Sequence, residues 1–321
     1  MNNIDKTKKR LSNIGTIGTL ILIIIVMSIV LLILRPNSFG TYTNFNNLLR
    51  QTSINGIIAL GMTIVIITAG IDLSVGAIVA YSGVLVSQLT VLHEMPVLLA
   101  VLISILLSTI IGIFNGILVH DAKIPPFIAT MGTMTILRGF VKFITGGRMI
   151  NNVPDSLTNI SQMNILGIPF LFLIWFILII FTYIFLNHTV AGRNIYALGS
   201  SREVARLSGI NIRTHIYLAY TISGLFSGIA GILLVSRLGA GIPTAGLSYE
   251  LDAIASSVIG GASLTGAEGS AIGTILGAFI MQMLRNGGNL LGIDPFILEM
   301  VIGFLIVISV YVDQLRKLKK S

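Results

Sequence analysis

The chain has 321 residues, of which 54% are hydrophobic and only 10% are charged, and its mean hydropathy is +0.95. Soluble domains carry about 25% charged residues, so this composition excludes a soluble globular domain and indicates a polytopic membrane protein. The net charge of +8 comes from short basic runs at the ends of apolar stretches. That distribution is typical of membrane topology and argues against nucleic-acid binding.

The first predicted element is a membrane span over residues 15–34, preceded by a basic tail at 1–14. The apolar stretch is longer than the core of a signal peptide, which has roughly 7–15 residues, and it lacks a small-residue cleavage site. We therefore expect a retained first span. The sequence contains no cysteine, which excludes disulfides, thiolate catalysis and cysteine-based metal sites.

Apolar stretches of about 20 residues predict ten spans in an all-α transmembrane bundle that forms a single domain over residues 1–321. The predicted spans lie near 15–34, 48–69, 73–92, 97–119, 126–145, 167–187, 214–236, 250–265, 269–285 and 295–313. Glycines and polar residues interrupt the second and third spans and the eighth and ninth. Eight spans with re-entrant segments are therefore the alternative.

The lysines and arginines orient these spans. Threading the chain with its N-terminus inside places most basic residues on the cytoplasmic side, including the loop at 188–214 and the tail at 314–321. Arg237 and Arg285 fall on the outer side. Both termini are predicted to be cytoplasmic by the positive-inside bias.

Two short breaks in the apolar pattern are similar to each other. They read AGIDLS at 69–74 and GGASLT at 260–265, and each lies between two short spans. Paired broken spans in two halves are the pattern expected where a membrane protein builds a pathway. After the second break, Gly269, Gly273 and Gly277 recur every fourth residue. They are predicted to lie on one helix face and to allow close helix packing.

The loop at 188–214 contains a predicted short helix, written SSREVARLSGI. Ser200 or Ser201 is the expected N-cap, Glu203 falls in the first turn, and Gly209 is the expected stop. The loop contains four arginines and only this one acidic residue. A long basic insert between apolar spans is expected on the cytoplasmic side.

The search for catalytic motifs gives no candidate. The sequence has no GxxxxGK[ST] phosphate loop, no HExxH and no GxSxG, and its four histidines do not cluster. We therefore expect no catalytic residue, no metal ligand and no cofactor bound by this chain.

Four polar residues in or beside the spans are candidates for a translocation pathway: Asn55, Asp72, Asn115 and Arg138. Amides supply both donors and acceptors to sugar hydroxyls, whereas interhelical hydrogen bonds are the structural alternative for the two asparagines. Asp72 precedes a predicted helix, so capping is its alternative role. Arg138 could meet a carboxylate from another span.

Three long motifs carry a family resemblance: GMTIVIITAGIDLSVGAIVAYSG at 61–83, PPFIATMGTMTILRG at 125–139 and PTAGLSYELDAIASSVIGGASLTGAEGSAIGTILGAF at 243–279. They resemble the sugar-transport permeases of the ABC importer class, the ribose permeases above all. The stretch AGRNIYALGSSREVARLSGI at 191–210 resembles the loop through which such permeases engage their ATPase. The sequence TGAEGS at 265–270 departs from the glycine-rich, basic continuation usual in ribose permeases.

The resemblance implies a specific assembly. Two copies of the chain would form the pore in the lipid bilayer of a bacterial plasma membrane, with the pathway at their two-fold axis and no pocket for tight sugar binding within one subunit. An ATPase with two fused nucleotide-binding halves would lie on the cytoplasmic face, and an external sugar-binding protein would deliver a monosaccharide, ribose being favoured. The fold would resemble the vitamin B12 importer permease, with ten helices.

The resemblance also implies which residues couple the permease to the ATPase. They belong to the predicted helix and its caps: Ser201, Arg202, Glu203, Ala205, Arg206, Ser208 and Gly209. In particular, Ala205→Asp is expected to abolish transport without preventing membrane insertion, because it would place a charge in a packed interface. A self-sufficient secondary transporter or channel is the alternative function, and a membrane enzyme is the third.

Overall fold

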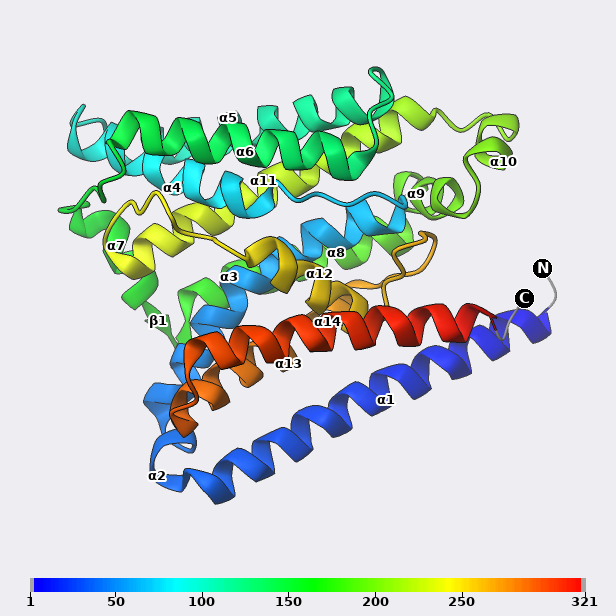
Figure 1. Cartoon of the computed structure of the whole chain (residues 1–321), viewed down its shortest axis with the longest axis horizontal. Coiled ribbons are helices and arrows are strands. Elements are labelled where there is room, and N and C mark those ends of the chain that lie inside the picture. Colours follow the sequence, from blue (N-terminus) through cyan, green and yellow to red (C-terminus); the bar gives the residue numbers. More distant parts are fainter. Residues whose placement is uncertain (1–2, 319–321) are drawn as a thin grey trace.

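The computed structural model describes residues 3–318, and within them all side chains except those of 3–14, 16, 312 and 316–318. This range forms fourteen helices and one short hairpin (Figure 1). The elements are α1 (Asn3–Leu34), α2 (Pro36–Phe39), α3 (Tyr42–Ile67), α4 (Val75–Val91), α5 (Val97–His120), α6 (Pro126–Thr145), α7 (Asp155–Gln162), β1 (Asn164–Ile165), β2 (Ile168–Pro169), α8 (Phe170–His188), α9 (Val190–Ser200), α10 (Arg202–Leu207), α11 (Ile212–Leu238), α12 (Tyr249–Ile259), α13 (Ala271–Leu291) and α14 (Pro295–Leu318).

Helices α3 and α11 form the centre of the bundle. In their most apolar stretches, 83% and 78% of the residues are buried, and α11 packs against α3, α4 and α5. A helix that is apolar on all sides and enclosed by other helices belongs to the core of a bundle. By contrast, α1 and α14 bury only 11% and 12% of their apolar stretches, and they run along one side of the molecule (Figure 1).

Seven helices of the described chain are long and apolar enough to cross a membrane, fewer than the ten predicted spans. The predicted span 73–92 is α4, a helix of 17 residues, and the predicted span 250–265 is α12, with only 11 residues. At ~1.5 Å per residue, α12 is about 16 Å long and cannot cross a hydrocarbon core of about 30 Å. The bundle therefore contains short helices beside full-length ones.

The helices at both chain ends extend beyond the predicted spans. Helix α1 begins at Asn3, within the predicted basic tail at 1–14, and α14 continues to Leu318, within the predicted tail at 314–321. Residues 1–2 and 319–321 lie outside the described residues. Between α7 and α8, the sequence analysis also missed the antiparallel pair β1–β2.

Both predicted breaks are present, and they lie against each other. Helix α3 ends at Ile67 and α4 begins at Val75, while α12 ends at Ile259 and α13 begins at Ala271. The backbone N–H of Ala267 donates to the carbonyl oxygen of Ile67 at 2.9 Å, so the second break is hydrogen-bonded to the end of α3. The internal repeat itself stays a prediction.

The glycine motif is confirmed in part. A Cβ on Gly273 would lie 1.9 Å from the carbonyl oxygen of Gly260, and one on Gly277 would lie 2.0 Å from that of Ser256. These two glycines therefore let α12 and α13 approach closely. The prediction was wrong for Gly269, which precedes the helix because the Ser270 side chain caps α13 by accepting from the N–H of Gly273.

Gly273→Ala is expected to lower the midpoint of thermal unfolding of the purified protein by several degrees. The added methyl group meets backbone rather than a movable side chain, so α12 and α13 must separate, and overpacking of this kind costs about 1–3 kcal/mol. Gly18→Ala in α1 is the matched control, because a Cβ there meets no atom within 4 Å. Equal unfolding midpoints for the two variants would contradict the close packing.

Candidate functional site

The predicted short helix in the loop at 188–214 is confirmed as α10, which projects at one end of the molecule beside α9 (Figure 1). Ser201 is the N-cap, and its hydroxyl accepts from the N–H of Val204 at 3.3 Å. Glu203 in the first turn pairs with Arg206 at 2.8 Å. Gly209 follows the helix with φ of 78°, a left-handed conformation that glycine adopts readily and that ends helices.

The two faces of α10 differ sharply in exposure. The Ala205 side chain is 1% exposed and belongs to the main apolar core, whereas Val204 and Leu207 are 62% and 76% exposed. A charge at Ala205 would therefore disrupt the packing of the chain itself rather than an interface. The exposed face, which a partner could contact, combines this apolar pair with polar and glycine positions: Arg202, Glu203, Arg206, Ser208 and Gly209.

Helix α9 connects α10 to both breaks in the bundle. The hydroxyl of Tyr196 donates to the carbonyl oxygen of Gly269 at 2.8 Å, immediately before α13. A Cβ on Gly199 would lie 1.8 Å from the carbonyl oxygen of Ile67 at the end of α3. A displacement of α9 would thus act directly on the ends of two core helices.

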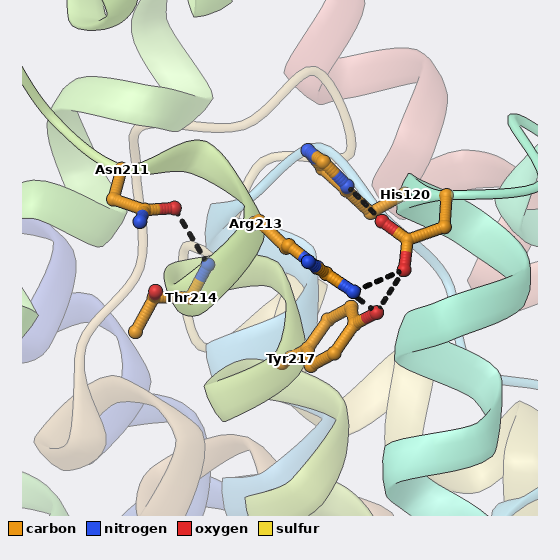
Figure 2. A network of polar contacts seen from close by, with 6 residues as sticks. His120, Asn211, Arg213, Thr214 and Tyr217 are labelled. Atoms are coloured by element: carbon orange, nitrogen blue, oxygen red, sulfur yellow. Dashed lines mark hydrogen bonds and ion pairs between the residues drawn. The ribbon is translucent and has the colours of Figure 1, made fainter.

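A polar network beside this loop ties α5 to the start of α11 (Figure 2). Asp121, which follows α5, accepts hydrogen bonds from Arg213 at 2.9 Å and from the Tyr217 hydroxyl, and it pairs with His120 at 2.8 Å. The hydrogen bond from Tyr217, followed by the contact with His120, lowers the pKa of the Asp121 carboxyl below its usual value. Arg213 is one of the four arginines of the loop at 188–214, and the sequence alone does not reveal this network because Asp121 lies 92 positions away.

Asp72 and Asn115 are brought together, but in a closed network rather than a pathway. Asp72 is fully buried; one carboxylate oxygen accepts from the N–H and hydroxyl of Ser74, and the other accepts from the Ser223 hydroxyl at 2.8 Å. Asn115 donates to the Ser74 hydroxyl at 2.8 Å and accepts from Thr133 at 2.7 Å. These contacts favour the structural alternatives for both residues.

Asp72→Ala is expected to destabilise the protein strongly, because it leaves three buried donors without an acceptor at a cost of about 1–3 kcal/mol each. We expect a large fall in the thermal unfolding midpoint in detergent. Asp155→Ala, at an exposed acid in the first turn of α7, is the matched control and should change the midpoint little. A midpoint for Asp72→Ala within a degree of that control would contradict the role of the network.

The other two pathway candidates have separate positions. Arg138 on α6 donates to the carbonyl oxygens of Ala245 and Gly246, at 2.5 and 2.7 Å, instead of pairing directly with a carboxylate. It therefore holds the segment between α11 and α12. Asn55 on α3 lines a cavity of about 240 Å³ and donates to Gln282 at 3.1 Å.

This cavity gathers residues that sequence reasoning did not connect. Besides Asn55, its walls include Gln51, Gln282, Arg237 and Arg285, which come from α3, α11 and α13. The two arginines were interpreted only as markers of the outer side. Their convergence depends on helix packing, for which the sequence has no local pattern. Within the described residues, no group of three or more histidines and acids could hold a metal ion.

Comparison with known proteins gives consistent relatives over most of the chain. Residues 44–310 match the family described as the permease component of the branched-chain amino acid transport system. The ribose import permease protein RbsC of Haemophilus influenzae is 40% identical over 91% of this chain and 91% of its own length. The corresponding protein of Bacillus subtilis is 42% identical over 89% and 88%.

A relative with another named sugar is the D-allose transport system permease protein AlsC of Escherichia coli, which is 35% identical over 88% of this chain and 86% of its own length. No solved structure matches the chain. These relatives agree with the family resemblance of the three long motifs and with the seven membrane-length helices among the described residues. The chain is a multi-pass membrane protein that belongs to the sugar-transport permease family of the ABC importers.

Proposed function

We propose that this chain is the membrane-spanning permease subunit of an ATP-driven importer that takes up a monosaccharide, with ribose as the substrate. The observation that carries the proposal is α10, a six-residue helix that presents an exposed apolar pair, Val204 and Leu207, on a basic loop. Apolar side chains exposed outside the membrane region fit a protein contact. The names of the ribose and allose relatives support the substrate class.

The proposed complex has four kinds of partner. A cytoplasmic ATPase with two fused nucleotide-binding halves binds α10, a second copy of this chain completes the pore, an external binding protein delivers the sugar, and the bilayer surrounds the bundle. We further propose a fold like that of the vitamin B12 importer permease, with about ten membrane segments of which some, such as α12, are short or broken. It lies in a bacterial plasma membrane with both termini cytoplasmic. The excess of basic residues in the loop at 188–214 supports this orientation.

The contacts of α9 suggest how the energy is transmitted. When the ATPase moves α10, α9 moves with it, because only Ser201 separates the two helices. Tyr196 and Gly199 then act on the breaks before α13 and after α3. Since Ala267 is hydrogen-bonded to Ile67, both breaks respond together.

The decisive experiment is uptake by proteoliposomes that contain this chain, its ATPase and the external binding protein. We expect import of labelled ribose that requires ATP hydrolysis and stops when the ATPase is omitted. A panel with allose and xylose tests the substrate. Uptake by the permease alone, driven by a proton gradient, would overturn the proposal and favour the secondary transporter.

A further inference from the structure

The cavity beside Asn55 lies at one end of the bundle. Its lining residues come from the first turns of α12 and α14, from the last turn of α11, from the middle of α3 and from the C-terminal half of α13. In the predicted topology these parts of the helices lie in the outer half of the bundle. A solute that arrives from outside would meet this cavity first in that topology, and the cavity is formed within a single copy of the chain.

The cavity wall is rich in polar groups whose partners are only partly supplied by the chain. Gln282 is almost fully buried, accepts from Asn55 and donates to Gln51 at 2.7 Å. The Oδ1 of Asn55 and the Nε of Arg285 are buried atoms without a hydrogen-bond partner among the described residues. The half-buried side chain of Arg237 forms no hydrogen bond or ion pair with any side chain that the structure describes. A buried donor or acceptor left unpaired is energetically costly, so Asn55 Oδ1 and Arg285 Nε are suited to pairing with a bound solute, and Arg237 offers further donors beside them.

The charges favour an uncharged solute over an anion. Arg285 is already paired with Asp252 at 2.7 Å. The cavity wall also contains both the positive Arg237 and the negative Glu299. The local charge is thus close to balanced, which gives a phosphate or carboxylate no net attraction. The guanidinium groups donate hydrogen bonds, and the amides both donate and accept them. Together they match the neighbouring hydroxyl groups of a sugar, which also donate and accept.

We infer that this cavity is a low-affinity contact site for the monosaccharide, formed in each copy of the chain on the outer side of the membrane. The sugar released by the binding protein exchanges its hydrogen bonds with water for those with Arg237, Asn55 and Arg285 before it crosses. Weak binding suits a transport site, because the sugar must leave it again. The inference rests on the proposed function for the identity of the solute.

The absence of cysteine from the chain allows a direct binding test. Asn289→Cys introduces a single thiol at an exposed position of the cavity wall, and Asn37→Cys introduces one on α2, away from it. We expect ribose at twice its dissociation constant to slow thiol labelling of Asn289→Cys by about threefold, as one-site occupancy requires. Labelling of Asn37→Cys should not change. If ribose, allose and xylose all fail to slow labelling of Asn289→Cys at saturating concentrations, the inference is overturned.

A transport measurement on the full complex gives the second test. Arg237→Met is expected to lower the rate of ATP-driven sugar uptake by at least about tenfold, equivalent to ~1.4 kcal/mol. Arg35→Met, at an exposed arginine outside the cavity, should transport like the wild type. Wild-type rates for Arg237→Met in a complex that does import sugar would overturn the contact site and leave the proposed function intact. Absence of import by the wild-type complex would instead refute the proposed function.

Discussion

Leu207→Asp is expected to abolish ATP-driven uptake by detaching the ATPase from the permease. Leu207 is 76% exposed at the end of α10, so the substitution does not disturb the core of the chain. Once the partner covers this face, however, an aspartate there becomes a buried, unpaired charge, which costs several kcal/mol. At 1.4 kcal/mol for each factor of ten, the affinity for the ATPase should fall by about 100-fold or more.

Co-purification of the ATPase with the tagged permease measures this effect directly. Leu166→Asp is the matched control, because Leu166 is 97% exposed in the turn between β1 and β2, on the side predicted to be external. Its φ of 52° is a conformation that aspartate tolerates. We expect the control to retain the ATPase and Leu207→Asp to lose it. Retention by both variants would show that α10 is not the docking element.

The sequence predicted the elements that depend on local patterns. The short helix between Ser201 and Gly209 was predicted correctly, because capping and termination are determined by neighbouring residues. The breaks near 69–74 and 260–265 were also predicted, because glycines and polar residues interrupt the apolar runs there. Local chemistry was therefore sufficient to locate α10 and both breaks.

Features that depend on packing between distant segments were not predictable in this way. The orientation of Ala205 is one example, since a six-residue helix is too short for a periodic pattern to reveal its buried face. The cavity is another, because Arg237 and Gln282 are brought to Asn55 by separate helices. Asp72 was considered for the pathway, yet its three donors include Ser223, which lies 151 positions away.

Gly199→Ala separates transmission from docking, and we expect it to eliminate sugar uptake while the ATPase remains bound. The new methyl group would lie 1.8 Å from the carbonyl oxygen of Ile67 and 2.7 Å from the N–H nitrogen of Ala267. Both atoms are backbone, so no flexible side chain can relieve the clash, and α9 must move away from both breaks. The exposed face of α10 is unchanged, so co-purification should persist.

The contrast between these variants tests the proposed route of energy through the permease. Leu207→Asp should lose both the ATPase and uptake, whereas Gly199→Ala should lose uptake alone. Tyr196→Phe removes only the hydrogen bond to Gly269, a net contribution of about 1 kcal/mol, and should lower uptake by severalfold in a fully folded chain. If Gly199→Ala and Tyr196→Phe both transport at wild-type rates, α9 does not carry the motion of α10 to the breaks, and the ATPase must act on the bundle through another contact.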